Sequence, residues 1–164
     1  MRIVVMSDSH GRADAVQRVL EQQKDAQLFI HLGDGLAEFH SVMAQYPDKE
    51  AWSVRGNCDF GSTEESLGSG FVRDKKILYT HGHQWNVKFT LDDLRELGQQ
   101  RWADVVLYGH THQPHYQYSD GMHLFNPGSL GSPKDGGEPT YGVIDMQGKS
   151  LVCTHIPLYP HLEA

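Results

Sequence analysis

Residues 3–11 read IVVMSDSHG, an apolar run that passes directly into a polar turn. A short, continuous run of apolar residues is typical of a strand that is buried on both faces of a sheet. Apolar residues then recur at helical spacing, at Ala13, Val16, Val19 and Leu20. The chain therefore begins with a strand, a polar turn and a helix, the repeating unit of an α/β fold with parallel strands.

The same unit recurs twice in the next part of the chain. Residues 28–32 (LFIHL) precede GDG at 33–35, and a predicted helix then ends near Pro47. Residues 51–54 (AWSV) precede RGNCD at 55–59. Each polar turn contains an Asp or Asn after a predicted strand, so the turns are as informative about function as the strands are about the fold.

Two later strands also end in polar turns that are rich in histidine. The strand predicted at 76–79 leads into THGH at 80–83, and DVVLY at 104–108 leads into GHTH at 109–112. These histidines follow apolar runs in the same way as the acidic residues do earlier in the chain. The pattern indicates that all of these polar turns lie at one common edge of the fold.

The middle of the chain is less regular. Residues 61–70 are rich in Gly, Ser and Glu and are expected to form a surface loop, while residues 71–73 and 76–79 are expected to pair as a hairpin. Thr90 and Asp93 fit a capping box at the start of a further helix.

Composition limits the classes of function. Lys and Arg number 14 against 21 Asp and Glu, which gives a formal net charge of −7 at pH 7. An acidic chain without a basic run is poorly suited to non-specific nucleic-acid binding or to an anionic membrane surface. Cys58 and Cys153 do not make a disulfide framework, and no apolar run has the length of a membrane span. We expect one domain over residues 1–164 and a reducing, cytoplasmic location.

Side chains that bind metals follow nearly every predicted buried strand in the first two thirds of the chain. They are Asp8, His10, Asp34, Asn57, His81, His110 and His112. Parallel strands bring their carboxyl ends to one edge of an α/β sheet, where ligands bind. This set is too large for one tetrahedral metal ion and suits two cations that share one carboxylate.

Five ordered blocks of the sequence resemble those of the calcineurin-like metallophosphoesterases. In order and spacing they are most similar to the small single-domain phosphodiesterases of bacteria and archaea. The blocks are Asp8-Ser9-His10, Gly33-Asp34, Gly56-Asn57, His81-Gly82 and Gly109-His110-Thr111-His112. The resemblance implies an α/β fold with two packed β-sheets flanked by helices, a four-layer αββα sandwich.

The resemblance also implies two divalent metal ions per chain and an assignment of their ligands. One metal ion would be held by Asp8, His10 and His112. The second would be held by Asn57, His81 and His110, and Asp34 would bridge the two. Neutral imidazole and carboxylate ligands suit manganese, which we expect, with nickel, iron or zinc as alternatives.

The expected activity is hydrolysis of a small phosphodiester, with a nucleotide-derived diester as one candidate. A hydroxide held between the two metal ions would attack phosphorus. We name Asn57, Cys58, Asp59 and His81 as the catalytic residues. Many relatives have His directly after the Asn, where it can protonate the leaving group; Cys58 is a poorer acid, and His83 is an alternative acid. Asp59 is expected to orient a ligand from behind it.

Two other features bear on the site. Asn126-Pro127-Gly128-Ser129 resembles the closing block of the family, and Lys134 beyond it is a candidate contact for phosphate. The remaining histidines, His31 among them, are expected to make ordinary polar contacts.

Plainer explanations stand beside these. Each Asp or Asn at a strand-to-helix turn, taken singly, is more often a helix cap than a ligand. The whole chain could serve as a catalytically silent scaffold of the same fold for protein assembly, or as a metal-binding regulator without turnover. A homo-oligomer is also open. Completeness of the ligand set favours the enzyme.

Overall fold

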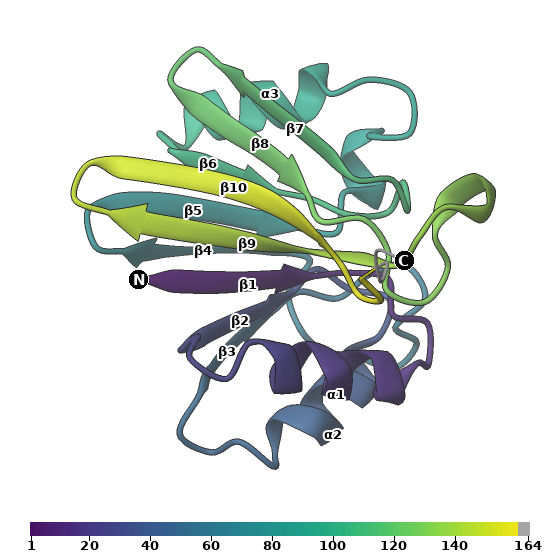
Figure 1. The fold of residues 1–164 in the computed structure, drawn as a ribbon. Coiled ribbons are helices and arrows are strands. Elements are labelled where there is room, and N and C mark those ends of the chain that lie inside the picture. The colour runs from purple at the N-terminus through teal and green to yellow at the C-terminus, as the bar shows by residue number, and fades with distance from the viewer. Residues whose placement is uncertain (161–164) are drawn as a thin grey trace.

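A computed structural model describes residues 1–160 and arranges them as two packed sheets with helices on the outer faces (Figure 1). The strand order of the first sheet is β10-β9-β1-β2-β3, with β1, β2 and β3 parallel and with β9 antiparallel to both β1 and β10. Its strands are β1 (Arg2–Met6), β2 (Leu28–His31), β3 (Glu50–Ser53), β9 (Thr140–Gln147) and β10 (Ser150–Pro157).

The second sheet is also mixed. Its order is β4-β5-β6-β8-β7, in which β5, β6 and β8 are parallel and the two outer pairs are antiparallel hairpin pairs. Its strands are β4 (Leu67–Val72), β5 (Lys75–Thr80), β6 (Val105–Leu107), β7 (His115–Ser119) and β8 (Met122–Asn126). The predicted hairpin at 71–79 is confirmed as the β4–β5 pair.

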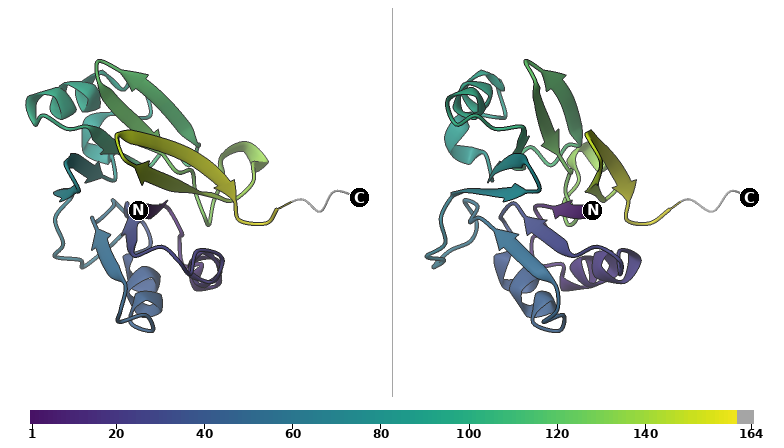
Figure 2. Two further views of the ribbon diagram at one scale, coloured as in Figure 1. Left: turned by 60° about the vertical axis from the view of Figure 1, so that its left-hand side comes forward. Right: turned by 90° about the vertical axis from the view of Figure 1, so that its left-hand side faces the viewer.

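Helices cover the outer faces of both sheets, as the views in Figure 2 show. α1 (Ala13–Gln22) and α2 (Leu36–Met43) pack on the first sheet, and α3 (Asp92–Gln100) packs on the second. Two short 3₁₀ turns, η1 (His83–Trp85) and η2 (Lys134–Gly136), lie in the loops. The predicted four-layer fold of two packed sheets flanked by helices is therefore confirmed.

The alternation of side chains along β1 shows how the layers are held. Val4 and Met6 face the helices in one apolar cluster, whereas Ile3 and Val5 face the second sheet in another. The cluster between the sheets also takes Phe125 from β8. A strand whose two faces both pack on apolar layers needs a continuous apolar run, which is the pattern at residues 3–6.

Two sequence expectations were wrong. The predicted loop at 61–70 ends early because β4 begins at Leu67. Gly68 and Gly70 of this strand lie under the stacked rings of Tyr79 and Trp52, where a Cβ would come within 2.3 Å and 2.6 Å of ring atoms. The glycines thus reflect close packing and not a loop.

The capping box at Thr90 and Asp93 is also absent. α3 begins at Asp92, its N-cap residue is Leu91, and no side chain caps it there. Thr90 Oγ1 instead accepts a hydrogen bond from the Asp92 N–H at 3.2 Å, which forms a local turn before the helix.

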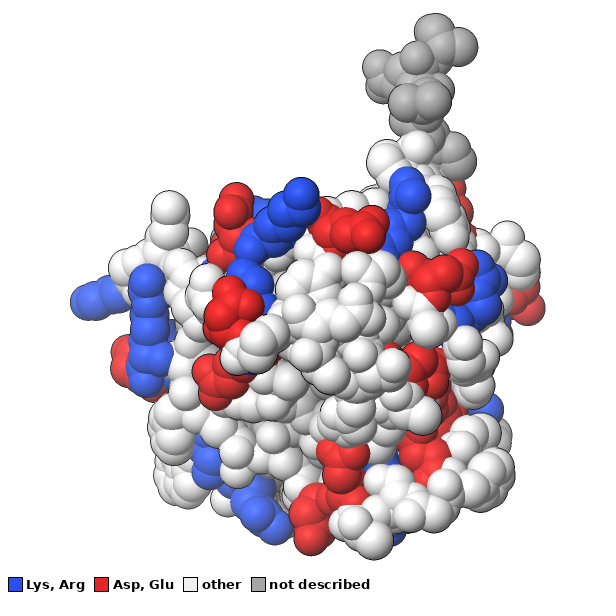
Figure 3. All heavy atoms as spheres, turned by 90° about the horizontal axis from the view of Figure 1, so that it is seen from below, with Lys and Arg blue, Asp and Glu red and all other residues white. Residues whose placement is uncertain are grey.

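The surface carries both signs of charge. On the face seen in Figure 3, Lys and Arg side chains alternate with Asp and Glu side chains around an uncharged middle. Among the helices of residues 1–160, none combines the length and the apolar character that crossing a bilayer requires.

Candidate metal centre

The polar turns after β1, β2, β5 and β6 meet at one edge of the fold and bond to one another through their backbones. The Asp8 N–H donates to Gly33 O at 3.0 Å, and the His10 N–H donates to Asp34 O at 2.9 Å. The Gly109 N–H donates to His81 O at 2.9 Å. Turns from distant parts of the sequence are thereby held in a fixed arrangement.

Asp8 is fully buried where the two sheets meet. Its Oδ2 accepts hydrogen bonds from the Ser7 hydroxyl and from the His110 N–H. Its Oδ1 lies 3.1 Å from His112 Nε2 and 3.6 Å from His10 Nε2, yet it has no hydrogen-bond partner within residues 1–160. A buried carboxylate oxygen without a partner is costly, and a bound cation would satisfy it.

Asp34 lies beside this group. Its Oδ2 is 3.3 Å from His81 Nε2 and 3.8 Å from His10 Nε2. Its Oδ1 accepts the Cys58 N–H at 2.7 Å. One Asp34 oxygen thus lies between a histidine of each expected metal set.

Backbone carbonyls fix the tautomers of two histidines. His81 Nδ1 is 2.7 Å from Leu32 O, and His112 Nδ1 is 2.7 Å from Ser132 O. A carbonyl oxygen only accepts, so each Nδ1 carries a hydrogen, and in the neutral imidazole each Nε2 presents a lone pair. These Nε2 atoms face the carboxylate oxygens and two further imidazoles, with His112 Nε2 3.2 Å from His10 Nε2 and His81 Nε2 3.1 Å from His110 Nδ1.

Three compact groups of possible ligands result within residues 1–160, each with its ligand atoms within 4.8 Å of one another. They are Asp8, His10 and His112; Asp34, His81 and His110; and His10, Asp34 and Cys58. Carboxylate oxygens and imidazole nitrogens in such groups suit a first-row divalent cation. The residues present therefore fit the divalent metal ions that metallophosphoesterases use.

The electrostatics keep the carboxylates ionised. Burial alone would raise the pKa of Asp8, but the neighbouring imidazoles of His10 and His112 outweigh burial and hold that pKa well below its usual range. Burial is likewise outweighed at Asp34, whose pKa is lowered mainly by His81. Burial, followed by the neighbouring His81, lowers the pKa of His110 to about 4. At neutral pH the centre offers charged oxygens and a neutral His110 imidazole.

Many of the expected ligands have a left-handed backbone conformation. These positive φ values are 54° at Asp8, 44° at His10, 57° at Asp34, 70° at His110 and 59° at His112. Residues other than glycine adopt this region rarely, at a cost of about 1 kcal/mol or more each. Such strain is concentrated at functional sites, because the turn must aim a side chain that a relaxed backbone would direct elsewhere.

Asp59 fastens two of the turns from behind. Its carboxylate accepts four backbone N–H groups: Gly56 and Asp34 at 2.7 Å, Gly35 at 2.9 Å and Leu36 at 3.0 Å. Asp59 therefore caps α2 from a distant loop. Neither α1 nor α2 has a side-chain cap at its own N-cap residue, Arg12 or Gly35.

The remaining expected residues are more loosely placed. Asn57 is exposed, and its side-chain hydrogen bond runs to Cys58 Sγ at 3.5 Å and not to a histidine. Cys58 is exposed as a residue, yet partial burial of its thiol, together with the neighbouring Asp34, raises the pKa of the thiol. His83 stands next to His81, with ring centroids 5.4 Å apart, and its buried Nδ1 lacks a partner in the described part of the chain.

His31 has a larger structural part than its sequence context indicated. It is fully buried; its Nδ1 accepts the Gly33 N–H at 3.0 Å, so its Nε2–H donates to Ser9 Oγ at 2.9 Å. The Ser9 hydroxyl donates in turn to Glu38, which also accepts the Gly11 N–H. The only sequence signal was its place at the end of a buried strand.

The closing block also supports the Asp8 turn. The Ser129 hydroxyl donates to Asp8 O at 2.8 Å, and the Gly131 N–H donates to the same oxygen at 3.0 Å. Residues 126–131 thus brace the backbone of Asp8 instead of presenting a ligand of their own.

Two packed sheets with Asp and His side chains gathered at one edge are the arrangement that the resemblance to the metal-dependent phosphoesterases implies. The chain belongs to the calcineurin-like phosphoesterase superfamily, whose domain model matches residues 1–149. It is 31% identical over 149 residues to the probable metallophosphoesterase YsnB of Bacillus subtilis, covering 90% of this chain and 85% of that one. It is 31% identical over 177 aligned residues to the phosphodiesterase YfcE of Escherichia coli K12, covering 93% and 91%. The resemblance to small bacterial and archaeal phosphodiesterases is confirmed.

Solved structures show the same architecture. A predicted phosphoesterase from Streptococcus pneumoniae superposes with a TM-score of 0.83 and 27% identity, over 98% of this chain and 94% of that one. Wild-type Vps29 of Entamoeba histolytica, complexed with Zn²⁺, superposes with a TM-score of 0.72 over 97% and 100% of the two chains. At 18% identity the second likeness shows the fold alone.

Proposed function

We propose that this chain is a metal-dependent phosphodiesterase that hydrolyses small, nucleotide-derived phosphodiesters. The observation that carries the proposal is the buried Asp8 Oδ1, which has no hydrogen-bond partner within residues 1–160 and lies 3.1 Å from His112 Nε2. Such a concentration of acceptors is unfavourable without a cation among them. The names of relatives such as YfcE and YsnB agree with this class of reaction.

The proposed ligands follow the two expected sets. One metal ion would be held by Asp8, His10 and His112, and the other by Asn57, His81 and His110, with Asp34 shared. Manganese is the metal that we propose, with nickel, iron and zinc as alternatives. Bound in pairs, divalent cations of this kind supply a hydroxide nucleophile at neutral pH and neutralise the oxygens of the phosphoryl group.

The residues of the chain contribute orientation and proton control. His81 and His112 are held by carbonyls with their Nε2 atoms toward the centre, so their imidazoles need no reorganisation before binding. Asp59 holds the turns of Asp34 and Asn57 in register. Asn57 and His81, which are proposed as catalytic residues, would act through the metal ion that they hold.

Neither candidate acid, Cys58 or His83, is well suited to protonate the leaving group in the proposed reaction. Cys58 is a neutral thiol at physiological pH, because burial and Asp34 raise its pKa. The pKa of His83 is lowered by burial and by His81, so its imidazole is neutral and a poor acid. We therefore propose that diesters with acidic leaving groups, such as phenols, are the better substrates.

The test is metal analysis of protein purified without chelator, together with assays of bis(p-nitrophenyl) phosphate with and without Mn²⁺. Asp34→Asn is expected to lose both turnover and tight binding of the second cation. Asp120→Asn is the matched control, because Asp120 has nearly the same backbone conformation (φ 56° against 57°) but lies in the β7–β8 turn. Parental turnover by Asp34→Asn would contradict the bridging assignment. Metal binding without turnover of any diester would favour a scaffold or a regulator instead.

The wider setting stays a set of predictions. We propose that residues 1–164 are one metallophosphoesterase domain in the cytoplasm. The free thiols of Cys58 and Cys153 accord with a reducing compartment. A homo-oligomer remains open.

A further inference from the structure

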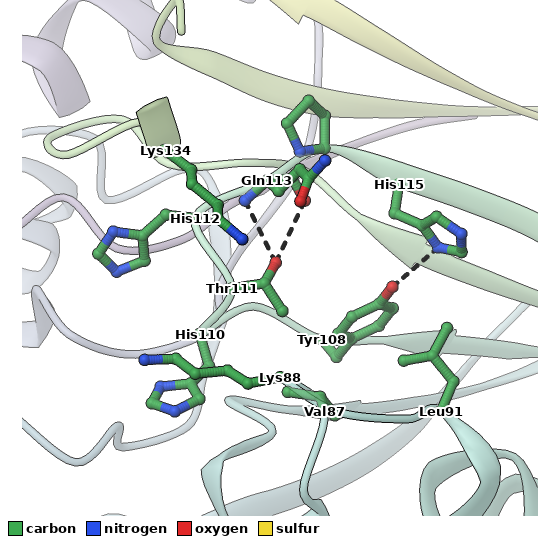
Figure 4. A pocket seen from close by; sticks show the side chains of 11 residues that line it. Val87, Lys88, Leu91, Tyr108, His110, Thr111, His112, Gln113, His115 and Lys134 are labelled. Atoms are coloured by element: carbon green, nitrogen blue, oxygen red, sulfur yellow. Dashed lines mark hydrogen bonds between the residues drawn. The ribbon is translucent and has the colours of Figure 1, made fainter. Parts of the chain in front are cut away.

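A pocket of about 500 Å³ borders the candidate metal centre beside His110 and His112 (Figure 4). Its volume lies in the range of pockets that bind small organic ligands. Val87, Leu91 and Tyr108 give it an apolar wall. A substrate held at the centre therefore has room for one bulky, partly apolar arm on this side.

Two cations line the same pocket. Lys88 extends beside His110, and Lys134 extends toward Thr111 from the other side (Figure 4). The N–H of Lys134 donates to His112 O at 3.1 Å, which ties this lysine to a turn of the centre. Within residues 1–160 neither ammonium group pairs with a carboxylate, and no Asp or Glu lines the pocket.

The hollow on the other flank of the centre has the opposite character. It borders the centre through His10, Asp34 and Cys58 and shares no lining residue with the first pocket. Its wall includes Glu38 and Glu64 but no Lys or Arg. An anionic group is disfavoured there by like charge and is attracted to the two lysines on the first side.

We propose that the pocket of Lys88 and Lys134 binds the arm of the diester that carries a second phosphate on a body of nucleoside size. The inference rests on the proposed function and adds the orientation of the substrate. The lysines would contact the second phosphate, and the apolar wall would contact the base or sugar. The uncharged arm would then face the acidic hollow.

The test compares two substrates that share the p-nitrophenolate leaving group. One is the p-nitrophenyl ester of thymidine 5′-phosphate, and the other carries an additional 3′-phosphate. The parent protein, loaded with Mn²⁺, is expected to prefer the second by about tenfold in kcat/KM, mainly through KM. Lys88→Met and Lys134→Met are each expected to reduce this preference about three- to fivefold, the range of one exposed ionic contact. Lys149→Met, an exposed lysine in the β9–β10 turn, is the control for loss of one positive charge.

Binding to the metal-free protein gives a second readout. Calorimetry should show that thymidine 3′,5′-bisphosphate binds more tightly than thymidine 5′-phosphate, and that both lysine variants diminish the difference. Equal hydrolysis of the two diesters, or variants that retain the full preference, would overturn the pocket assignment alone. Hydrolysis of neither diester by the Mn²⁺-loaded parent, with lysine-dependent bisphosphate binding intact, would overturn the phosphodiesterase proposal and leave the anion pocket standing.

Discussion

Asp59→Asn is the substitution that most directly tests how the centre is built. The carboxylate accepts four N–H groups, two at each oxygen: Gly35 and Leu36 at Oδ1, and Asp34 and Gly56 at Oδ2. An Asn side chain keeps one acceptor oxygen and replaces the other with an NH₂ group. Two backbone donors would then face a donor, and the negative charge at the start of α2 would be lost.

The expected loss of stability follows from these contacts. A buried N–H left without an acceptor costs about 1–3 kcal/mol, and the half-buried position of Asp59 keeps each at the low end of that range. Removing the charge beside the helix N-terminus costs about 0.5–1 kcal/mol more. The sum is about 3 kcal/mol. Asp145→Asn, which breaks an exposed ion pair with Arg2, is the control and should cost less than about 1 kcal/mol.

Urea unfolding at pH 7 in the presence of chelator measures this difference without a contribution from bound metal. Burial raises the pKa of Asp59, but the four backbone hydrogen bonds outweigh it and lower the pKa below 3.8. The stabilisation is thus present above pH 3.8 and is lost as the pH falls through the lower, folded-state value. Metal affinity should also fall about 10- to 100-fold. A urea midpoint equal to that of the parent would refute the idea that Asp59 fastens the turns.

Three further predictions concern single residues. Burial lowers the pKa of His31 to about 4, so the folded chain resists a proton that the unfolded chain accepts below about pH 6.5. The contribution of His31 to the free energy of unfolding is then full above pH 6.5 and falls by about 2 kcal/mol at pH 5 in metal-free protein. His31→Gln should lack this part of the pH dependence. Urea unfolding that gives the same slope of stability against pH for both proteins would contradict it. Cys58→His should raise kcat/KM most for diesters with alkoxide leaving groups, and an equal effect on phenolic and alkyl diesters would argue against an acid at this position. Gly109→Ala would place a Cβ 2.1 Å from Ser7 Oγ and 2.9 Å from Asp8 Oδ2, so we expect about 1–3 kcal/mol of destabilisation and weaker metal binding, measured by thermal unfolding and calorimetry. A variant with parental metal affinity would show that these contacts relax freely.

The sequence was sufficient for the sheets and for the place where the expected ligands gather. Apolar runs such as 3–6 and 28–31 pack on both faces, and a polar turn directly after such a run must lie at the carboxyl end of the sheet. Asp8 and Asp34 could therefore be placed near each other from pattern alone. Their distances to the histidines depend on turn conformations that the pattern does not encode.

The failures have a shared physical cause. The first part of β4 was missed because Gly68 and Gly70 pack under rings from β5 and β3, and a contact between distant strands leaves no local signal. His31 looked ordinary because its partner, Ser9, lies on another turn. Lys88 was not predicted as a functional residue, because it becomes a pocket residue only when its loop is folded beside His110.

The fold has to hold several expected ligands in a left-handed backbone conformation, at Asp8, His10, Asp34, His110 and His112. The site therefore depends on the fold, whereas the fold does not depend on the site. Glycine relaxes such a turn, so replacing His112 with Gly should abolish ligation while stabilising the chain by roughly 1 kcal/mol relative to Ala. The turns of the expected ligands thus lower the stability of the fold that holds them. A descendant that lost its histidines would keep a sound framework, free to be reused for assembly with other proteins.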